Sequence, residues 1–446
     1  MRMQLITAQT SGKIKNTTTK KINIAEKLAL AATALVGGTV QAQENDSEWD
    51  FSASVLAYSE TDRVSAVEVI GTADKDYSDT SHLSMKFVLD SLTGSSANGA
   101  IEQNTPQTFT RPSGNGNFII DANDTPLDDT FRDTRGQFNI SWTDALAEDM
   151  RYAVGSNLSK EYDYTSISVS GEVARDFNQK NSTLSVGLSF GADQYSPEGD
   201  IPIAFTSMVV DEGQFASDAD YRAAFDATRG DDSDDITTSE LLLGWTQIVN
   251  RNMLMQFNYG YADTSGYLTD PFKILSVVDN TGVTQDLVYE NRPDSRTQHS
   301  LFGLMKYHLD NSVFDVSYRY ITDDWEIQSH TIDTHWHFFA GDGSFWEPHV
   351  RFYQQDAAEF YTPFLAQAAA TPEFASADYR IGEMTAITLG LKYGFQISNG
   401  DRAEIRLEYY KQSPTKVNEP QGIANLEGLD FYPEVDALIL QFNYYF

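Results

Sequence analysis

Apolar and polar residues alternate along this chain in one segment after another, each spanning about ten positions. Side chains of an extended chain point to opposite faces in turn, so each segment predicts a β-strand with one apolar and one polar face. About ten residues is also the length of a tilted strand that crosses a bilayer. The clearest apolar faces lie within 253–261, 314–320, 387–395, 405–409 and 438–446. The pattern therefore predicts membrane-spanning strands whose apolar faces meet lipid.

The connections between these segments differ in length in a regular way. One side has short turns at 74–79, 144–149, 176–181, 249–252, 309–312, 341–344 and 398–401. The other side has long loops at 93–135, 193–236, 263–295, 356–382 and 412–433. Short periplasmic turns and long extracellular loops are typical of outer-membrane barrels. We therefore predict an all-β fold, a transmembrane antiparallel up-and-down β-barrel of about sixteen strands, with fourteen to eighteen possible.

The chain finishes on an alternating aromatic strand. Phe442, Tyr444 and Phe446 share one face of it. Such an end resembles the C-terminal assembly signal of bacterial outer-membrane barrels. It implies that outer-membrane lipid and the barrel-assembly machinery are partners, and that the protein lies in the outer membrane of a Gram-negative bacterium.

The N-terminal segment predicts a cleaved signal peptide rather than part of the fold. Five lysines precede an apolar run at 28–40, and Val40-Gln41-Ala42 offers the small-residue pattern of a cleavage site. We expect residues 1–42 to be the signal peptide and residues 43–446 to form the barrel. The apolar run is too short to span a bilayer, which argues against an anchor.

Composition narrows the function classes. The chain has no cysteine and a formal net charge of -34 at pH 7, so nucleic acid would be repelled rather than bound. Mean hydropathy is -0.40, a value that a barrel shares with soluble proteins because its lipid face occupies only every second residue. The loops are polar, and 211–240 is the most acidic; we interpret it as a solvated loop that repels or loosely binds divalent ions.

Charged residues fall on the faces that would point into the lumen. The predicted lumen and selectivity residues are Lys86, Asp315, Arg319, Asp333, His335, His337, His349, Arg351, Lys392, Glu404, Arg406 and Glu408. Imidazole and carboxylate are ligands of zinc, copper or iron, which makes Asp333, His335, His337 and His349 candidates for a metal site. The alternative is that these residues belong to the interleaved charges that line any barrel interior. We favour the alternative.

No catalytic or cofactor motif is recognisable. Ser329 and His330 are neighbours in sequence, but adjacent residues of a strand point to opposite faces and cannot form a dyad. Nucleophile elbows, Walker loops and dinucleotide fingerprints are missing from the sequence. We therefore expect neither enzymatic activity nor a cofactor.

The second half resembles a family of bacterial outer-membrane proteins known as DUF3570. The motifs that carry the resemblance are the sequences at 95–100, 244–247, 266–271, 289–296, 318–320, 323–325, 329–331, 347–354 and 377–380. The family has no established activity. Its members accompany periplasmic flavin-transfer and thioredoxin-like proteins, which implies a redox or export system. The resemblance also places Arg292, Asp294, Arg296, Asp323 and Asp324 at the extracellular mouth, where we favour ion pairs that order the loops over ligand capture.

Two functions compete at this point. The first is a porin-like channel or transport conduit for small solutes, with selectivity set by the lumen charges. The second is a barrel that serves as a sleeve or scaffold for periplasmic or surface partners, such as a redox protein or lipoprotein in extracellular electron transfer. The sequence does not decide between them.

Overall fold

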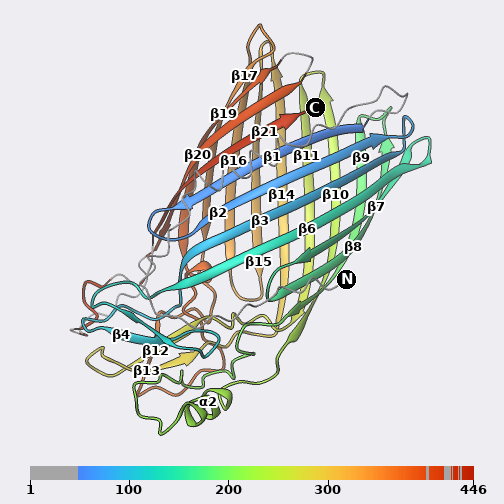
Figure 1. Cartoon of the computed structure of the whole chain (residues 1–446). Helices are drawn as coiled ribbons and strands as arrows, with labels where there is room; N and C mark the ends of the chain where they lie inside the picture. The colour runs from blue at the N-terminus through green and yellow to red at the C-terminus, as the bar shows by residue number, and fades with distance from the viewer. Residues whose placement is uncertain (1–48, 398–400, 416–422, 424, 430, 432–433) are drawn as a thin grey trace, which may run out of the picture.

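The computed structural model describes residues 49–397, 401–415, 423, 425–429, 431 and 434–446 (Figure 1). The predicted signal peptide, residues 1–42, lies outside the described residues. Within them, sixteen antiparallel strands form a closed barrel in which each strand pairs with the next along the chain. The prediction of an up-and-down barrel is confirmed.

The barrel strands have the following bounds: β1 Trp49–Glu60, β2 Ser65–Asp76, β3 His82–Ala97, β6 Leu127–Ala147, β7 Met150–Lys160, β8 Tyr164–Phe177, β9 Ser182–Tyr195, β10 Asp234–Asn250, β11 Met253–Gly266, β14 Ser295–Leu309, β15 Ser312–Asp323, β16 Gln328–Phe339, β17 Phe345–Gln355, β19 Met384–Gln396, β20 Arg402–Pro414 and β21 Val435–Tyr445. They have 11 to 21 residues and so exceed the predicted length. The alternating pattern identifies only the apolar centre of each strand, because both ends of the strand continue beyond the lipid into polar hairpins.

The barrel closes where the first strand meets the last. β1 pairs with β21 in a register that places Val55 opposite Phe442. The amide of Phe446 also donates to the carbonyl of Phe51 at 3.1 Å. Closure leaves neither end of the sheet with an unpaired edge.

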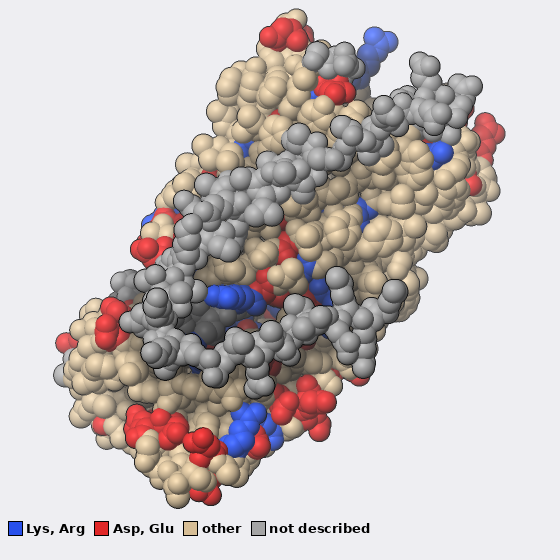
Figure 2. Space-filling model, in the orientation of Figure 1, with Lys and Arg blue, Asp and Glu red and all other residues tan. Residues whose placement is uncertain are grey.

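The outer wall is apolar. Leu89, Leu188, Ile332, Leu407 and Leu440 are between 42% and 53% exposed although each belongs to a regular strand. Figure 2 shows the wall as mainly tan, with charged atoms gathered chiefly toward the ends of the molecule. An apolar band of this kind around a closed barrel is the surface that lipid covers.

The long connections fold together at one end of the barrel, and we call this assembly the cap: residues 98–126, 196–233, 267–294, 356–383 and the described part of 415–434. It contains a two-stranded sheet, β4 (Gln107–Thr110) with β5 (Asn117–Ile120), and a three-stranded sheet in the order β13 (Thr284–Tyr289), β12 (Ile274–Val278), β18 (Phe364–Ala366). Helix α2 (Asp218–Asp226) and the 3-10 helix η1 (Tyr379–Ile381) complete it. In Figure 1 the cap lies beyond the strand ends, away from the short turns.

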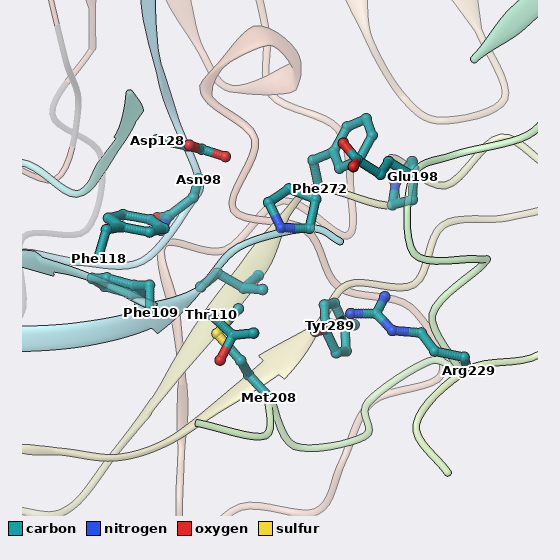
Figure 3. Close-up of a pocket in the computed structure, with 13 residues that line it drawn as sticks. Asn98, Phe109, Thr110, Phe118, Asp128, Glu198, Met208, Arg229, Phe272 and Tyr289 are labelled. Carbon is teal, nitrogen blue, oxygen red and sulfur yellow. Dashed lines mark hydrogen bonds between the residues drawn. The ribbon is translucent and has the colours of Figure 1, made fainter. Parts of the chain in front are cut away.

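The cap has an apolar core of its own. Phe109 and Leu275 are fully buried, and Ile274, Val278 and Phe225 are 1% exposed. Figure 3 shows Phe109 and Phe118 side by side near Tyr289 of β13. The expectation of simply polar, solvated loops therefore misses a folded layer, because its apolar residues are isolated in sequence and meet only through long-range contacts.

Among the described residues, no helix has the length and apolar character needed to cross a membrane.

Candidate functional site

The predicted lumen residues all lie on inward faces of barrel strands. On β16, Ile332 and Trp336 face outward and are 47% and 42% exposed, so Asp333, His335 and His337 face the interior. The same alternation turns the remaining predicted residues inward: Lys86 on β3, Asp315 and Arg319 on β15, His349 and Arg351 on β17, Lys392 on β19, and Glu404, Arg406 and Glu408 on β20.

Four strands bring part of this set into one charged network. His335 of β16 lies directly opposite His349 of β17. Nδ1 of His335 is 3.2 Å from Oδ1 of Asp333 and 3.3 Å from Oδ1 of Asp315. Nδ1 of His349 is 2.8 Å from Oε1 of Glu408, which is in turn 3.6 Å from Nη1 of Arg406.

A second group lies beside the first on the same wall. Glu347 accepts from Nζ of Lys392 at 2.8 Å and pairs with Nδ1 of His337 at 2.9 Å. The His337 ring stacks on Phe345, with centroids 4.1 Å apart. The structure thus separates His337 from the other three metal candidates, because its ring already pairs with Glu347 and Phe345.

The inward charges of this wall differ in exposure. Glu404 and Glu408 are each 5% exposed, whereas Arg319, Arg351 and Lys306 are exposed. Because these cations point into a closed barrel, their exposure requires water in the lumen.

Exposed carboxylates also face the lumen. Glu172 of β8 and Glu240 of β10 face inward and are exposed. In the order of the barrel strands, β10 is separated from β14, which carries Lys306, by β11 alone. The lumen therefore carries exposed groups of both signs.

The cap holds a buried charged cluster built from three of the family-like motifs. Nε of Arg292 is 2.6 Å from Oε1 of Glu290, and its Nη2 is 2.8 Å from Oδ2 of Asp378. Glu290 and Asp378 are each 1% exposed. Arg380 bridges Asp378 to Asp270, so the connections 267–294 and 356–383 are joined by charge.

Burial and neighbouring charges shift the pKa values in this cluster in opposite directions. Burial raises the pKa of Glu290 to about 7, although Arg292 opposes the shift. Burial would also raise the pKa of Asp378, but Arg380, Lys273 and Arg292 hold it well below its ordinary value. Burial lowers the pKa of Lys273, whose Nζ donates to the carbonyl of Ala97.

Two glycines of the family-like motifs lie where another backbone segment approaches closely. Gly99 has φ +97°, and a Cβ there would lie 2.4 Å from the carbonyl oxygen of Ile274. Gly266 has φ +121°, and a Cβ there would lie 2.0 Å from the carbonyl oxygen of Asp235. No other residue fits either position without displacing backbone.

The predicted mouth residues form two separate groups. Arg292 joins the buried cluster, whereas Arg296 pairs with Asp323 and covers the Trp325 ring at 4.6 Å. Oδ1 of Asp324 accepts from the amide of Thr297 at 3.0 Å. Asp294 contributes its carbonyl, which accepts from the amide of Gly266 at 2.8 Å.

A cavity of about 520 Å³ lies between the barrel rim and the cap. Its wall is charged and aromatic and includes Arg132, Asp133, Glu161, Asp163, Tyr195, Asp270, Phe272, Lys273 and Arg380. Burial, followed by a hydrogen bond with Asp133, raises the pKa of Glu161 to about 7. A smaller pocket beside it, of about 30 Å³, is closed by Arg229, whose Nη2 donates to the hydroxyl of Tyr289 at 2.5 Å (Figure 3).

Some of these residues could have been found by sequence reasoning. Alternation along the predicted strands is enough to place four further charged residues on the polar, inward face: Lys306, Glu347, Glu172 and Glu240. The buried cluster gives a fainter signal. Glu290 with Arg292, and Asp378 with Arg380, are opposite charges two residues apart inside loops.

The fold and the charged, water-accessible lumen define an integral, multi-pass β-barrel of the outer membrane. The sequence matches one family model, described as "Protein of unknown function (DUF3570)", over residues 25–446. The chain belongs to the DUF3570 family. Among curated proteins, none matches it.

Several solved structures are similar to this chain at low identity. A bacterial polysaccharide outer membrane secretin has 9% identity and a TM-score of 0.41, with 89% of this chain and 97% of that chain covered. The outer membrane protein OpdK from Pseudomonas aeruginosa has 10% identity and a TM-score of 0.39, with 90% and 99% covered. The siderophore receptor PirA from Pseudomonas aeruginosa has 5% identity and a TM-score of 0.38, with 83% and 57% covered.

Proposed function

We propose that the protein is a conduit that carries small polar solutes across the outer membrane. The observation that carries this proposal is the exposure of inward-facing charges such as Lys306, Arg319 and Arg351. Charged groups in a closed barrel stay exposed only where the interior is hydrated, and a hydrated lumen lets polar solutes pass.

The distribution of charge narrows the solute class. Exposed cations on β14 to β17 and the exposed carboxylates of Glu172 and Glu240 all face the lumen. Fixed charges of both signs favour small molecules that carry both signs of charge over apolar ones. A solute that enters from the cap side would first reach the cavity of about 520 Å³ beneath the cap. The walls of this cavity also carry positive and negative side chains.

Planar lipid bilayers test the proposal. Purified, folded barrel is expected to give ohmic conductance that rises with salt concentration. A folded barrel that conducts no ions and admits no zwitterionic solute into liposomes would overturn it. A barrel that is silent and also co-purifies with a periplasmic or surface protein would instead support the sleeve or scaffold, which is the second function considered from the sequence.

A further inference from the structure

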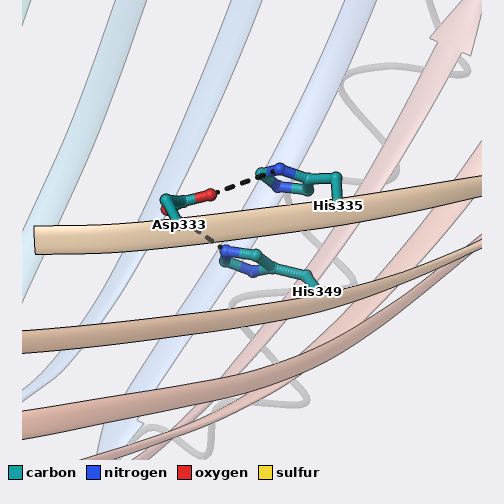
Figure 4. A group of neighbouring side chains, drawn as sticks. All are labelled: Asp333, His335 and His349. Atoms are coloured by element: carbon teal, nitrogen blue, oxygen red, sulfur yellow. Dashed lines mark hydrogen bonds and ion pairs between the residues drawn. The ribbon is translucent and has the colours of Figure 1, made fainter. Parts of the chain in front are cut away.

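One group of side chains in the lumen wall has the chemistry of a metal site. Asp333 and His335 share the inward face of β16, and His349 lies opposite His335 on β17. Each offers a ligand atom, and the three atoms lie within 4.8 Å of one another. Figure 4 shows both imidazoles turned toward the Asp333 carboxylate. Among the residues that the structure describes, no other group of His, Asp and Glu meets this spacing.

The surrounding residues orient the two imidazoles. Glu408 of β20 pairs with Nδ1 of His349 at 2.8 Å, which turns Nε2 toward Oδ2 of Asp333 at 3.4 Å. Nδ1 of His335 lies 3.3 Å from Asp315 of β15 and 3.2 Å from Asp333. In His349, Glu408 is a carboxylate behind the second nitrogen, the usual support of a metal-bound histidine, because it fixes the tautomer and the ring orientation.

The two imidazole rings lie side by side in a fixed arrangement. They are parallel, with centroids 4.3 Å apart and planes within 2°. The stacking keeps both rings beside the same carboxylate, as the binding of a single ion requires.

The site also has space for further ligands. A cavity of about 250 Å³ opens beside it, lined by His335, His349, Glu404, Arg406, Glu408 and neighbouring residues of β21. Water can therefore complete the coordination of an ion held by three protein ligands.

We propose that Asp333, His335 and His349 bind one divalent transition-metal ion of the Zn²⁺, Fe²⁺ or Mn²⁺ class on the lumen wall. Two imidazoles and one carboxylate suit these borderline ions, whereas Ca²⁺ and Mg²⁺ require oxygen ligands. The inference stands apart from the proposed conduit, since a sealed barrel could bind the ion equally well.

Metal titration of the untagged, folded barrel in detergent tests the site. Zn²⁺ binding by calorimetry, together with the visible absorption of Co²⁺, is expected to show one tight ion per barrel. His349→Gln and Asp333→Asn are each expected to weaken binding by about 100-fold or more, and Glu408→Gln, which leaves the three ligands in place, by about 10- to 100-fold. His330→Gln is the matched control, because His330 faces outward on the same strand and contacts the Tyr318 hydroxyl.

Wild-type affinity no tighter than that of His349→Gln and Asp333→Asn would overturn the site, as would equal loss in His330→Gln. Histidine modification by diethyl pyrocarbonate gives a readout that needs no variant. Zn²⁺ is expected to protect His335 and His349 while leaving His330 reactive. Unchanged modification of His335 and His349 at saturating Zn²⁺ would overturn the proposal even if a variant failed to fold.

Discussion

Arg292 and Asp378 lie 86 residues apart in sequence, yet Nη2 of Arg292 is 2.8 Å from Oδ2 of Asp378 and both side chains are buried. The pair joins the connection before β14 to the connection before β19. Together with Glu290 it joins two segments of the cap to each other.

Arg292→Met is expected to loosen the cap without unfolding the barrel. The substitution leaves Glu290 and Asp378 buried with less positive charge nearby, and losing one partner of a buried pair costs about 3–5 kcal/mol. Hydrogen exchange should rise at 267–294 and 356–383, while barrel strands keep their protection. Arg251→Met, in the exposed turn between β10 and β11, is the control and should leave both unchanged. Equal exchange in the two variants would contradict a role for the pair in cap stability.

Asp323→Asn is expected to destabilise the turn between β15 and β16. Asp323 pairs with Arg296, and its Oδ1 also accepts from the amides of Trp325 and Ile327. Weakening these charge-assisted bonds should cost about 1.5–3 kcal/mol and speed hydrogen exchange at Trp325 and Ile327. Asp324→Asn, on the exposed neighbour, should have a much smaller effect.

The cap is expected to lose stability as pH rises from about 5 toward 8. Glu290 has its pKa raised to about 7, so folded protein holds a proton that unfolded protein has already released above about 4.5. The folded state therefore binds more protons in this window, and its free energy of unfolding falls by at most about 1.4 kcal/mol per pH unit for this group.

Native-state hydrogen exchange of the cap, corrected for the intrinsic rate, measures this dependence. Glu290→Gln should flatten the slope, and Glu161→Gln should flatten it further because the pKa of Glu161 is also raised to about 7. Asp378 acts outside this window: its pKa is lowered, so its contribution is lost only in stronger acid. A slope unaffected by both Gln variants would contradict the assignment.

Lumen substitutions are expected to change ion selectivity in opposite directions. Glu172→Gln should lower the cation-to-anion permeability ratio, and Arg351→Gln should raise it. The expected size is about twofold, since a unit charge about 10 Å away in water changes an ion's energy by about 0.4 kcal/mol. Reversal potentials in a KCl gradient report the ratio. Arg175→Gln is the control, because Arg175 lies on the outward face of β8 and its charge does not face the lumen.

Removal of Phe446 is expected to lower the yield of folded barrel in the outer membrane. Phe446 is 55% exposed, contacts the Tyr444 ring with centroids 4.7 Å apart, and donates its amide to Phe51. Heat-modifiable migration of extracted protein measures the folded fraction. Tyr445→Ala, on the inward face beside it, should assemble more completely than the deletion. Full assembly without Phe446 would refute its assignment to the assembly signal.

The barrel could be predicted from the sequence because its rules are local. Residues such as Ile387 and Leu389 alternate with polar neighbours, and alternation fixes both strand and facing. The cap could not, because its contacts are distant: Ser276 of β12 pairs in parallel with Phe364 of β18. The sequence names four candidate metal ligands while ordinary lumen charges are the favoured interpretation, and three of the four converge in the structure. Alternation predicts which face of a strand a residue lies on, but it does not predict that His337 pairs with Glu347.

The seam between β1 and β21 sets an order in time. Leu56 is the partner of Gln441, so the wall can close only after every other barrel strand has been synthesised. Until Val435–Tyr445 pair, the sheet keeps two open edges that can recruit other chains. Closure joins the first and the last strands of the barrel, and contacts between residues so distant in sequence form slowly. The unclosed sheet is therefore the species most in need of protection on the way to the membrane.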